Sequence, residues 1–158
     1  TAYYSFGQGT FYSKPAATVF NNVASWGDQP DGSGAAPASV SNADNFIVAN
    51  GSNMTSSAAV SVRSLSISSG SSLSVTGSTL TVGIPSQNNS FLVVEGGGTL
   101  TVSGGTTNVN GAFRVLQNGN FTQSGGAINV DGNNGGDPAT SVAAVRLSYS
   151  LVMYLVLL

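Results

Sequence analysis

Few residues of this chain carry a side chain that can act as an acid, a base, a nucleophile or a metal ligand. The 158 residues include six carboxylates and four basic side chains, and they include no histidine and no cysteine. Without histidine, a hydrolase would need a pair of carboxylates held at a fixed separation. Asp28 and Asp31 are close in sequence, but they fall in a Gly- and Pro-rich stretch, where aspartate ordinarily forms turns. We therefore predict no catalytic residue, no cofactor and no enzymatic activity.

A second stretch offers oxygen ligands for a hard cation. Asp131, Asn133 and Asp137 lie in the sequence DGNNGGD, which partly matches a calcium-binding loop but lacks the later bidentate glutamate of an EF-hand. A solvated loop that leaves the last strand is the simpler interpretation. We predict no metal site and keep these three residues only as Ca²⁺ candidates.

The low charge of the chain excludes one class of partner and favours one compartment. Only 6% of the residues are charged, and the formal net charge is -2. Such a chain cannot neutralise a row of phosphates, so no nucleic-acid partner is expected. The abundance of Ser, Thr and Asn favours secretion. The apolar run 151–158 is shorter than the roughly 20 residues that a membrane-spanning helix needs, so no membrane span is expected.

Short runs with an apolar-x-apolar pattern recur along the chain and must provide the scaffold. An alternation of period two indicates strands, and the Gly, Ser-Gly and Asn-Gly breaks between the runs indicate sharp corners. We expect positive φ at three of these corner glycines, Gly104, Gly125 and Gly126. The runs begin at Leu65, Leu73, Leu80, Phe91, Leu100, Thr107, Phe113, Phe121 and Ile128.

The spacing of these runs predicts the fold class. They group in threes, with about 22 residues for each group and a longer loop at 83–90. We predict an all-β protein that forms a short right-handed parallel β-helix with three strands per coil. An antiparallel sandwich of short strands is the alternative. The side chains expected to point inward are Leu73, Val75, Leu80, Val82, Leu100 and Val102.

The two ends of the chain differ from this repeat, which predicts three regions: an N-terminal cap over 1–44, the β-solenoid over 45–135, and a linker with an apolar C-terminal strand over 136–158. A solenoid must cap its first coil, and the first 26 residues are rich in aromatic side chains. The simpler interpretation is that these aromatic side chains form the cap and part of the core. The alternative is an aromatic acceptor or sugar-binding surface made by Tyr3, Tyr4, Phe6, Phe11, Tyr12 and Trp26.

The C-terminal segment is predicted to be a strand, because Val and Tyr favour one, and a helix is the alternative. As a strand it is apolar on both faces from residue 151 onward, so it must lie between two layers of protein. A tail folded back beneath its own cap would meet this need, and so would a tail bound by a neighbouring copy. We predict the second arrangement, with the aromatic N-terminal region as the acceptor. The residues expected to make the assembly contact are Tyr149, Leu151, Met153, Tyr154, Leu155, Leu157 and Leu158.

Several phrases resemble a family of bacterial surface proteins. Tyr12-Ser13-Lys14 is followed by ASWG at 24–27 and DGSG at 31–34, and the later phrases are VRSLSI at 62–67 and GNFTQSGGAINVDGN at 119–133. This combination resembles the N-terminal β-solenoid repeat region of adhesin-like surface proteins that Bacteroidota secrete by the type IX system. The resemblance implies a structural or adhesive role at the bacterial surface, and it carries over no catalytic residue.

These observations predict an extracellular structural protein, on the bacterial surface or in a secreted matrix. It would be the subunit of a homopolymeric filament or matrix fibre, assembled through β-strand and apolar contacts between copies of itself. Covalent glycans at Asn-x-Ser/Thr sequences, or an extracellular polysaccharide, are further partners that the sequence leaves open. The alternatives are a carbohydrate-binding adhesin module of a longer secreted protein and, third, a polysaccharide-active β-helix enzyme.

Overall fold

The computed structural model describes residues 8–84 and 90–130. This part of the chain consists of short strands joined by turns, with one 3-10 turn at Val23–Ser25. In chain order, the strands are β1 (Thr10–Ser13), β2 (Trp26–Gly27), β3 (Asn45–Val48), β4 (Asn53–Ser56), β5 (Val60–Val62), β6 (Ser64–Ile67), β7 (Ser72–Val75), β8 (Thr79–Val82), β9 (Phe91–Val94), β10 (Thr99–Val102), β11 (Thr106–Val109), β12 (Ala112–Val115), β13 (Asn120–Gln123) and β14 (Ala127–Val130).

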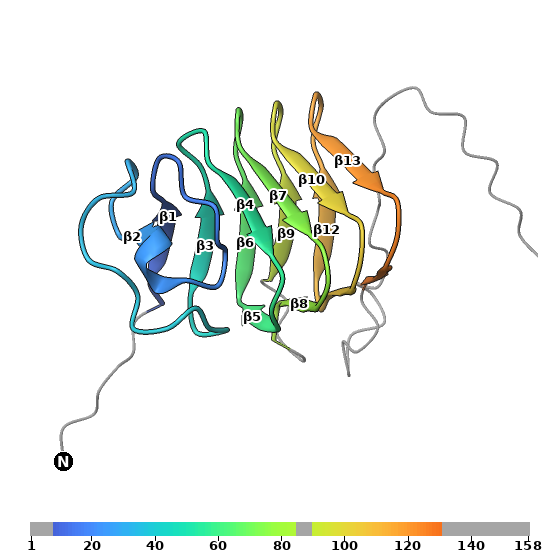
Figure 1. Ribbon diagram of the computed structural model, residues 1–158, viewed down its shortest axis with the longest axis horizontal. Coiled ribbons are helices and arrows are strands. Elements are labelled where there is room, and N and C mark those ends of the chain that lie inside the picture. Colours follow the sequence, from blue (N-terminus) through green and yellow to red (C-terminus); the bar gives the residue numbers. More distant parts are fainter. Residues whose placement is uncertain (1–7, 85–89, 131–158) are drawn as a thin grey trace, which may run out of the picture.

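The strands form three sheets, and each sheet takes every third strand of the chain from β3 onward (Figure 1). The first sheet has the order β12-β9-β6-β3-β1-β2, the second β13-β10-β7-β4, and the third β14-β11-β8-β5. All neighbours within the sheets pair in parallel except β1 and β2, which are antiparallel. The predicted all-β fold with stacked parallel strands is confirmed for the described residues.

The strands therefore fall into four triplets, β3–β5, β6–β8, β9–β11 and β12–β14, where the run pattern alone indicated three. The additional triplet precedes Leu65. Its strand β4 places Met54 and Ser56 inward, in register with Leu73 and Val75. Because Ser56 is polar, this strand does not match an apolar-x-apolar pattern. The strand β4 forms because it pairs with β7, and not because its own sequence has a hydrophobic pattern.

The core is a set of ladders in which one inward residue stacks on its counterpart in the next triplet. In the second sheet, Leu73 pairs in register with Leu100 and Val75 with Val102. Each inward side chain leaves water by packing against its neighbours in the ladder, which is the main favourable contribution to folding. All six side chains predicted to point inward are fully buried, which confirms that prediction: Leu73, Val75, Leu80, Val82, Leu100 and Val102.

One run begins a residue later than the sequence pattern indicated. Leu92, and not Phe91, pairs with Leu65 and with Phe113 in the core ladder of the first sheet. Phe91 is 40% exposed on the outer face. The run 91–94 is apolar at all four positions, so local alternation cannot assign its phase. Register with the neighbouring strands decides which two of the four side chains are buried.

The prediction of positive φ at three corner glycines is correct for only one of them. Gly126 has the expected positive φ (66°), but Gly104 and Gly125 do not, and in the first Gly-Gly pair the left-handed residue is Gly105 (φ 69°). Gly104 is required for a different reason, because a Cβ atom there would collide with the carbonyl oxygen of Thr76 in the preceding triplet. The second glycine of each pair makes the turn, and the first permits the close approach of two backbones.

Thr107 interrupts an otherwise apolar ladder in the third sheet. It lies between Leu80 and Ile128, is fully buried, and its hydroxyl has no hydrogen-bond partner among the described residues. A buried hydroxyl without a partner is costly, whereas a methyl group of the same shape is not. We expect Thr107→Val to raise the free energy of unfolding by about 1 kcal/mol, measured by urea denaturation. Thr101→Val on an outer face is the control, and a destabilised Thr107→Val variant would contradict the assignment.

Candidate functional site

The aromatic side chains near the N-terminus close one end of the stack of strands. The Trp26 indole Nε1 donates a hydrogen bond to the carbonyl oxygen of Phe20 over 2.8 Å. Its ring packs edge-on against Phe20 (centroids 5.2 Å apart) and Phe46 (4.9 Å). Trp26 is 0% exposed. It belongs to the core of the cap, and its assignment to a sugar-binding or acceptor surface is wrong.

The other aromatic candidates are only partly accounted for. Phe11 stacks on Phe46 with ring centroids 5.7 Å apart, and both Phe11 and Tyr12 are half-buried in β1. Tyr3, Tyr4 and Phe6 lie outside the described residues. The described aromatic side chains Phe11 and Tyr12 are therefore partly covered by their own chain.

The two clustered aspartates serve as turn acceptors. The Asp28 Oδ1 atom accepts hydrogen bonds from the backbone N–H of Ala35 (3.0 Å) and from the side-chain Nε2 of Gln29 (3.2 Å). Asp31 Oδ1 accepts one from the backbone N–H of Ser33 (2.9 Å). Hydrogen bonds from Ser33 stabilise the charged form of Asp31 and hold the pKa of this carboxyl below its usual range. The interpretation of Asp28 and Asp31 as turn residues is confirmed.

Within residues 8–84 and 90–130, no group of three or more Asp, Glu, His or Cys side chains is arranged to hold a metal ion. The Ca²⁺ candidates Asp131, Asn133 and Asp137 lie outside the described residues. The predicted assembly residues lie outside them as well: Tyr149, Leu151, Met153, Tyr154, Leu155, Leu157 and Leu158.

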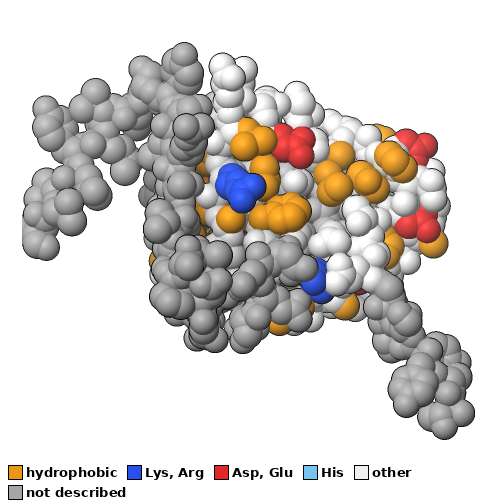
Figure 2. Space-filling model, turned by 180° about the vertical axis from the view of Figure 1, so that it is seen from behind, with side chains coloured by type: hydrophobic (Ala, Val, Ile, Leu, Met, Phe, Trp, Pro, Cys, Tyr) orange, Lys and Arg blue, Asp and Glu red, His pale blue; other side chains and the backbone are white. Residues whose placement is uncertain are grey.

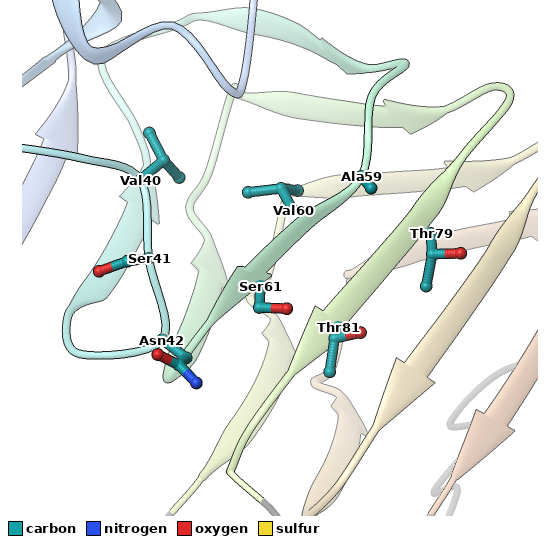
Figure 3. A pocket seen from close by; sticks show the side chains of 8 residues that line it. All are labelled: Val40, Ser41, Asn42, Ala59, Val60, Ser61, Thr79 and Thr81. Carbon is teal, nitrogen blue, oxygen red and sulfur yellow. The ribbon is translucent and has the colours of Figure 1, made fainter.

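A shallow groove of about 360 Å³ lies between the loop before β3 and the outer face of the third sheet. Figure 3 shows the loop on one side of the groove, β5 on the other, and β8 beyond β5. The lining has no charged or titratable group, so the groove can offer hydroxyl and amide hydrogen bonds but no acid–base chemistry. Its lining residues are Val40, Ser41, Asn42, Ala59, Val60, Ser61, Thr79 and Thr81.

The outer faces of the second and third sheets carry rows of uncharged polar side chains. Some of these side chains bond to one another across neighbouring strands: the Ser72 hydroxyl donates to Asn53 Oδ1 (2.7 Å), and the Asn129 amide donates to Asn108 Oδ1 (2.9 Å). Stacked copies of uncharged residues do not repel one another, as like charges would. The rows in register on the second sheet are Asn53-Ser72-Thr99-Asn120 and Thr55-Ser74-Thr101-Thr122.

The outer face of the first sheet has a different character, and sequence reasoning missed it. Phe91 and Leu116 are 40% and 45% exposed, and the exposed Arg114 lies in register with the half-buried Val93. Figure 2, which views the molecule from behind Figure 1, shows hydrophobic side chains grouped around a basic one, with an acidic one beside it. Arginines that are scattered in sequence gave no signal of this grouping, because strand register creates it.

The end of the stack opposite the cap has free edges. β12, β13 and β14 each have a paired strand on one side only, in the described part of the chain. Phe121, Ile128 and Val130 are partly buried there and pack against the core. Free strand edges beside half-covered apolar side chains are a template for pairing with further strands.

Comparisons of this chain with protein-family models, with curated proteins and with solved structures give no match. The described residues contain no helix that is long and apolar enough to cross a membrane. The pairing of the strands defines the described residues as an all-β structure of stacked parallel strands.

Proposed function

We propose that this chain is an extracellular structural protein, the subunit of a homopolymeric surface filament or matrix fibre. In this proposal the four triplets are the coils of a short right-handed parallel β-helix with three strands per coil. Residues 1–44 form its cap, 45–135 the solenoid, and 136–158 the linker and assembly strand. The bacterial surface or a secreted matrix is its location, in keeping with the sequence phrases that resemble type IX-secreted proteins of Bacteroidota.

The observation that carries this proposal is the unequal finish of the two ends. At the N-terminal end, the antiparallel pair β1–β2 and the ring cluster of Phe20, Trp26 and Phe46 complete the core. Each end has three edge strands among the described residues, β2, β4 and β5 at the first and β12, β13 and β14 at the other. The ends differ in how the core is covered, because Phe46 and Met54 are buried at the first end, whereas Phe121 and Ile128 are only half-buried at the other. A strand donated by a neighbouring copy would supply the missing backbone hydrogen bonds and cover these side chains.

The surface chemistry supports assembly as well. The second and third sheets present Ser, Thr and Asn instead of charges, and the whole chain has a net charge of only -2. A small net charge produces little repulsion between copies, so it opposes their association only weakly. A contact in which one copy donates a strand and the next accepts it is heterologous, and it propagates into a filament unless it closes.

Deleting residues 147–158 tests the proposal. We expect the truncated chain to remain a folded monomer and to form no filaments, because the donated apolar strand is lost. Negative-stain microscopy and size-exclusion chromatography measure the result, and circular dichroism checks the fold. The matched variant keeps full length but replaces Tyr149, Leu151 and Met153 with serine, and it should behave in the same way. Filaments of normal appearance from the truncated chain would reject this assembly mechanism.

A carbohydrate-binding adhesin module of a longer secreted protein is the second candidate function. The exposed group of Phe91, Arg114 and Leu116 on the first sheet favours it, because an aromatic ring beside a hydrogen-bond donor can hold a sugar. Monomeric protein that binds a glycan array and forms no filaments would support this second function over the first.

A further inference from the structure

We propose that the outer face of the first sheet binds a carboxylated polysaccharide, with Arg114 as the residue that recognises the carboxylate. The inference rests on the second candidate function above, and it names the chemical class of the ligand and its site. The site consists of Phe91 and Val93 on β9, Arg114 on β12, and Leu116 directly after β12.

The register of two neighbouring strands brings these four side chains onto one face. Arg114 is directly opposite Val93, and Phe91 is opposite Ala112, two residues earlier on the same face. Residues in diagonal positions of this kind lie roughly 7–8 Å apart, and somewhat less at Cβ, which is within the reach of long and aromatic side chains. The inward neighbours Leu92 and Phe113 are buried in the core and fix the orientation of both strands.

The exposed cation on this face points to an anionic group on the ligand. Arg114 is exposed, and it forms no salt bridge with any acid in the part of the chain that the structure describes. The planar guanidinium presents paired N–H donors that match the two oxygens of a carboxylate. One arginine flanked by Phe91, Val93 and Leu116 suits a ligand with a single carboxylate beside an apolar surface.

Glu95 sets the direction in which the ligand lies. It follows β9, beyond Val93, and it is half-buried near the opposite end of the patch from Phe91. Its carboxylate repels an anion, so a ligand carboxylate on Arg114 is favoured when the rest of the ligand extends toward Phe91. The C–H face of a sugar ring can then pack on the exposed aromatic ring.

The position within the sheet favours a saccharide over an extended peptide. β9, which carries Phe91 and Val93, is paired on both sides, with β6 and β12, so a peptide strand could add only at the free edge of β12, away from the aromatic ring. Recognition on this face depends on side chains: one aromatic ring, two aliphatic groups and one cation. A sugar acid can satisfy these groups through a ring face and a carboxylate, without backbone pairing.

The test measures binding of the full chain to a defined oligouronate by isothermal titration calorimetry. The comparison ligands are the same oligosaccharide with its carboxyl groups methyl-esterified, a sulfated oligosaccharide, and an oligoglutamate peptide. We expect binding to the oligouronate only, with an affinity that falls as ionic strength rises.

Variants assign the interaction to individual side chains. We expect Arg114→Gln to weaken binding about tenfold or more, and Arg114→Lys to weaken it less, because the lysine keeps the charge but loses the paired donors. Phe91→Ala should weaken it about fivefold. Glu95→Gln should strengthen binding a few-fold, because it removes a like charge. Thr122→Ala, on the second sheet, is the control and should have no effect.

The outcomes separate this inference from the functions above. Equal binding of the methyl ester would overturn the carboxylate assignment and leave a neutral-sugar adhesin. Preference for the sulfated sugar or for oligoglutamate would overturn the ligand class. Weaker binding by Glu95→Gln would contradict the stated direction of the ligand. If no glycan binds at all, both the inference and the adhesin function fail, while filament assembly is judged by the deletion variant alone.

Discussion

Replacing Trp26 with alanine is expected to lower the free energy of unfolding by about 3–5 kcal/mol. The indole fills the centre of the cap, where it packs against Phe20 and Phe46 and is fully buried. Its removal leaves a large cavity and deprives the Phe20 carbonyl oxygen of its 2.8 Å hydrogen bond. Domains of this size are typically stable by about 5–15 kcal/mol, so the variant would retain only part of its stability.

Urea denaturation followed by circular dichroism measures this effect. Fluorescence is unsuitable, because Trp26 is the single tryptophan and its signal disappears in the variant. Trp26→Phe keeps an aromatic ring in the cap, and it should lose clearly less stability than the alanine variant. Phe91→Ala removes a large side chain that is 40% exposed, and it should cost less than about 1 kcal/mol. If Trp26→Ala and Phe91→Ala proved equally mild, the cap would not depend on a packed Trp26.

Gly105→Ala is expected to be the most damaging of three single-methyl substitutions at turns. Gly105 has φ 69°, and a Cβ atom there would collide with backbone atoms of Ser78 in the preceding triplet. A left-handed conformation costs an L-residue roughly 1–2 kcal/mol, and the displaced backbone adds to this. We therefore expect a total loss of more than about 2 kcal/mol, measured as the shift in the urea midpoint.

Two other glycines separate these contributions. Gly70 has φ 74° with open space around the added Cβ, so Gly70→Ala reports the conformational cost alone. Gly77 has open space and no positive φ, so Gly77→Ala should change the stability by no more than about 0.5 kcal/mol. The expected order of destabilisation is Gly105, then Gly70, then Gly77. If Gly105→Ala cost no more than Gly70→Ala, close backbone approach would not be what requires glycine at position 105.

Local pattern was sufficient wherever apolar and polar residues alternate without ambiguity. Leu73-Ser74-Val75 and Leu100-Thr101-Val102 each assign one face to the core, and the spacing between them implies stacking of one on the other. The low charge likewise determines the character of the outer faces, because Ser, Thr and Asn are the residues left to cover them. The all-β class follows from the alternation, and the spacing favours stacked parallel strands over an antiparallel sandwich, which the alternation alone would also allow.

Register between strands that are distant in sequence decided the rest. Phe91 and Leu92 are equally apolar, and only the pairing of Leu92 with Leu65 and Phe113 places Phe91 outside, beside Arg114. Ser56 belongs to a core ladder because it stacks beneath Val75, and Trp26 is buried because β2 pairs with β1 over Phe46. A residue's own neighbours in sequence carry no information about these contacts. The exposed patch on the first sheet therefore exists only in the folded chain, where parallel pairing brings β9 and β12 side by side.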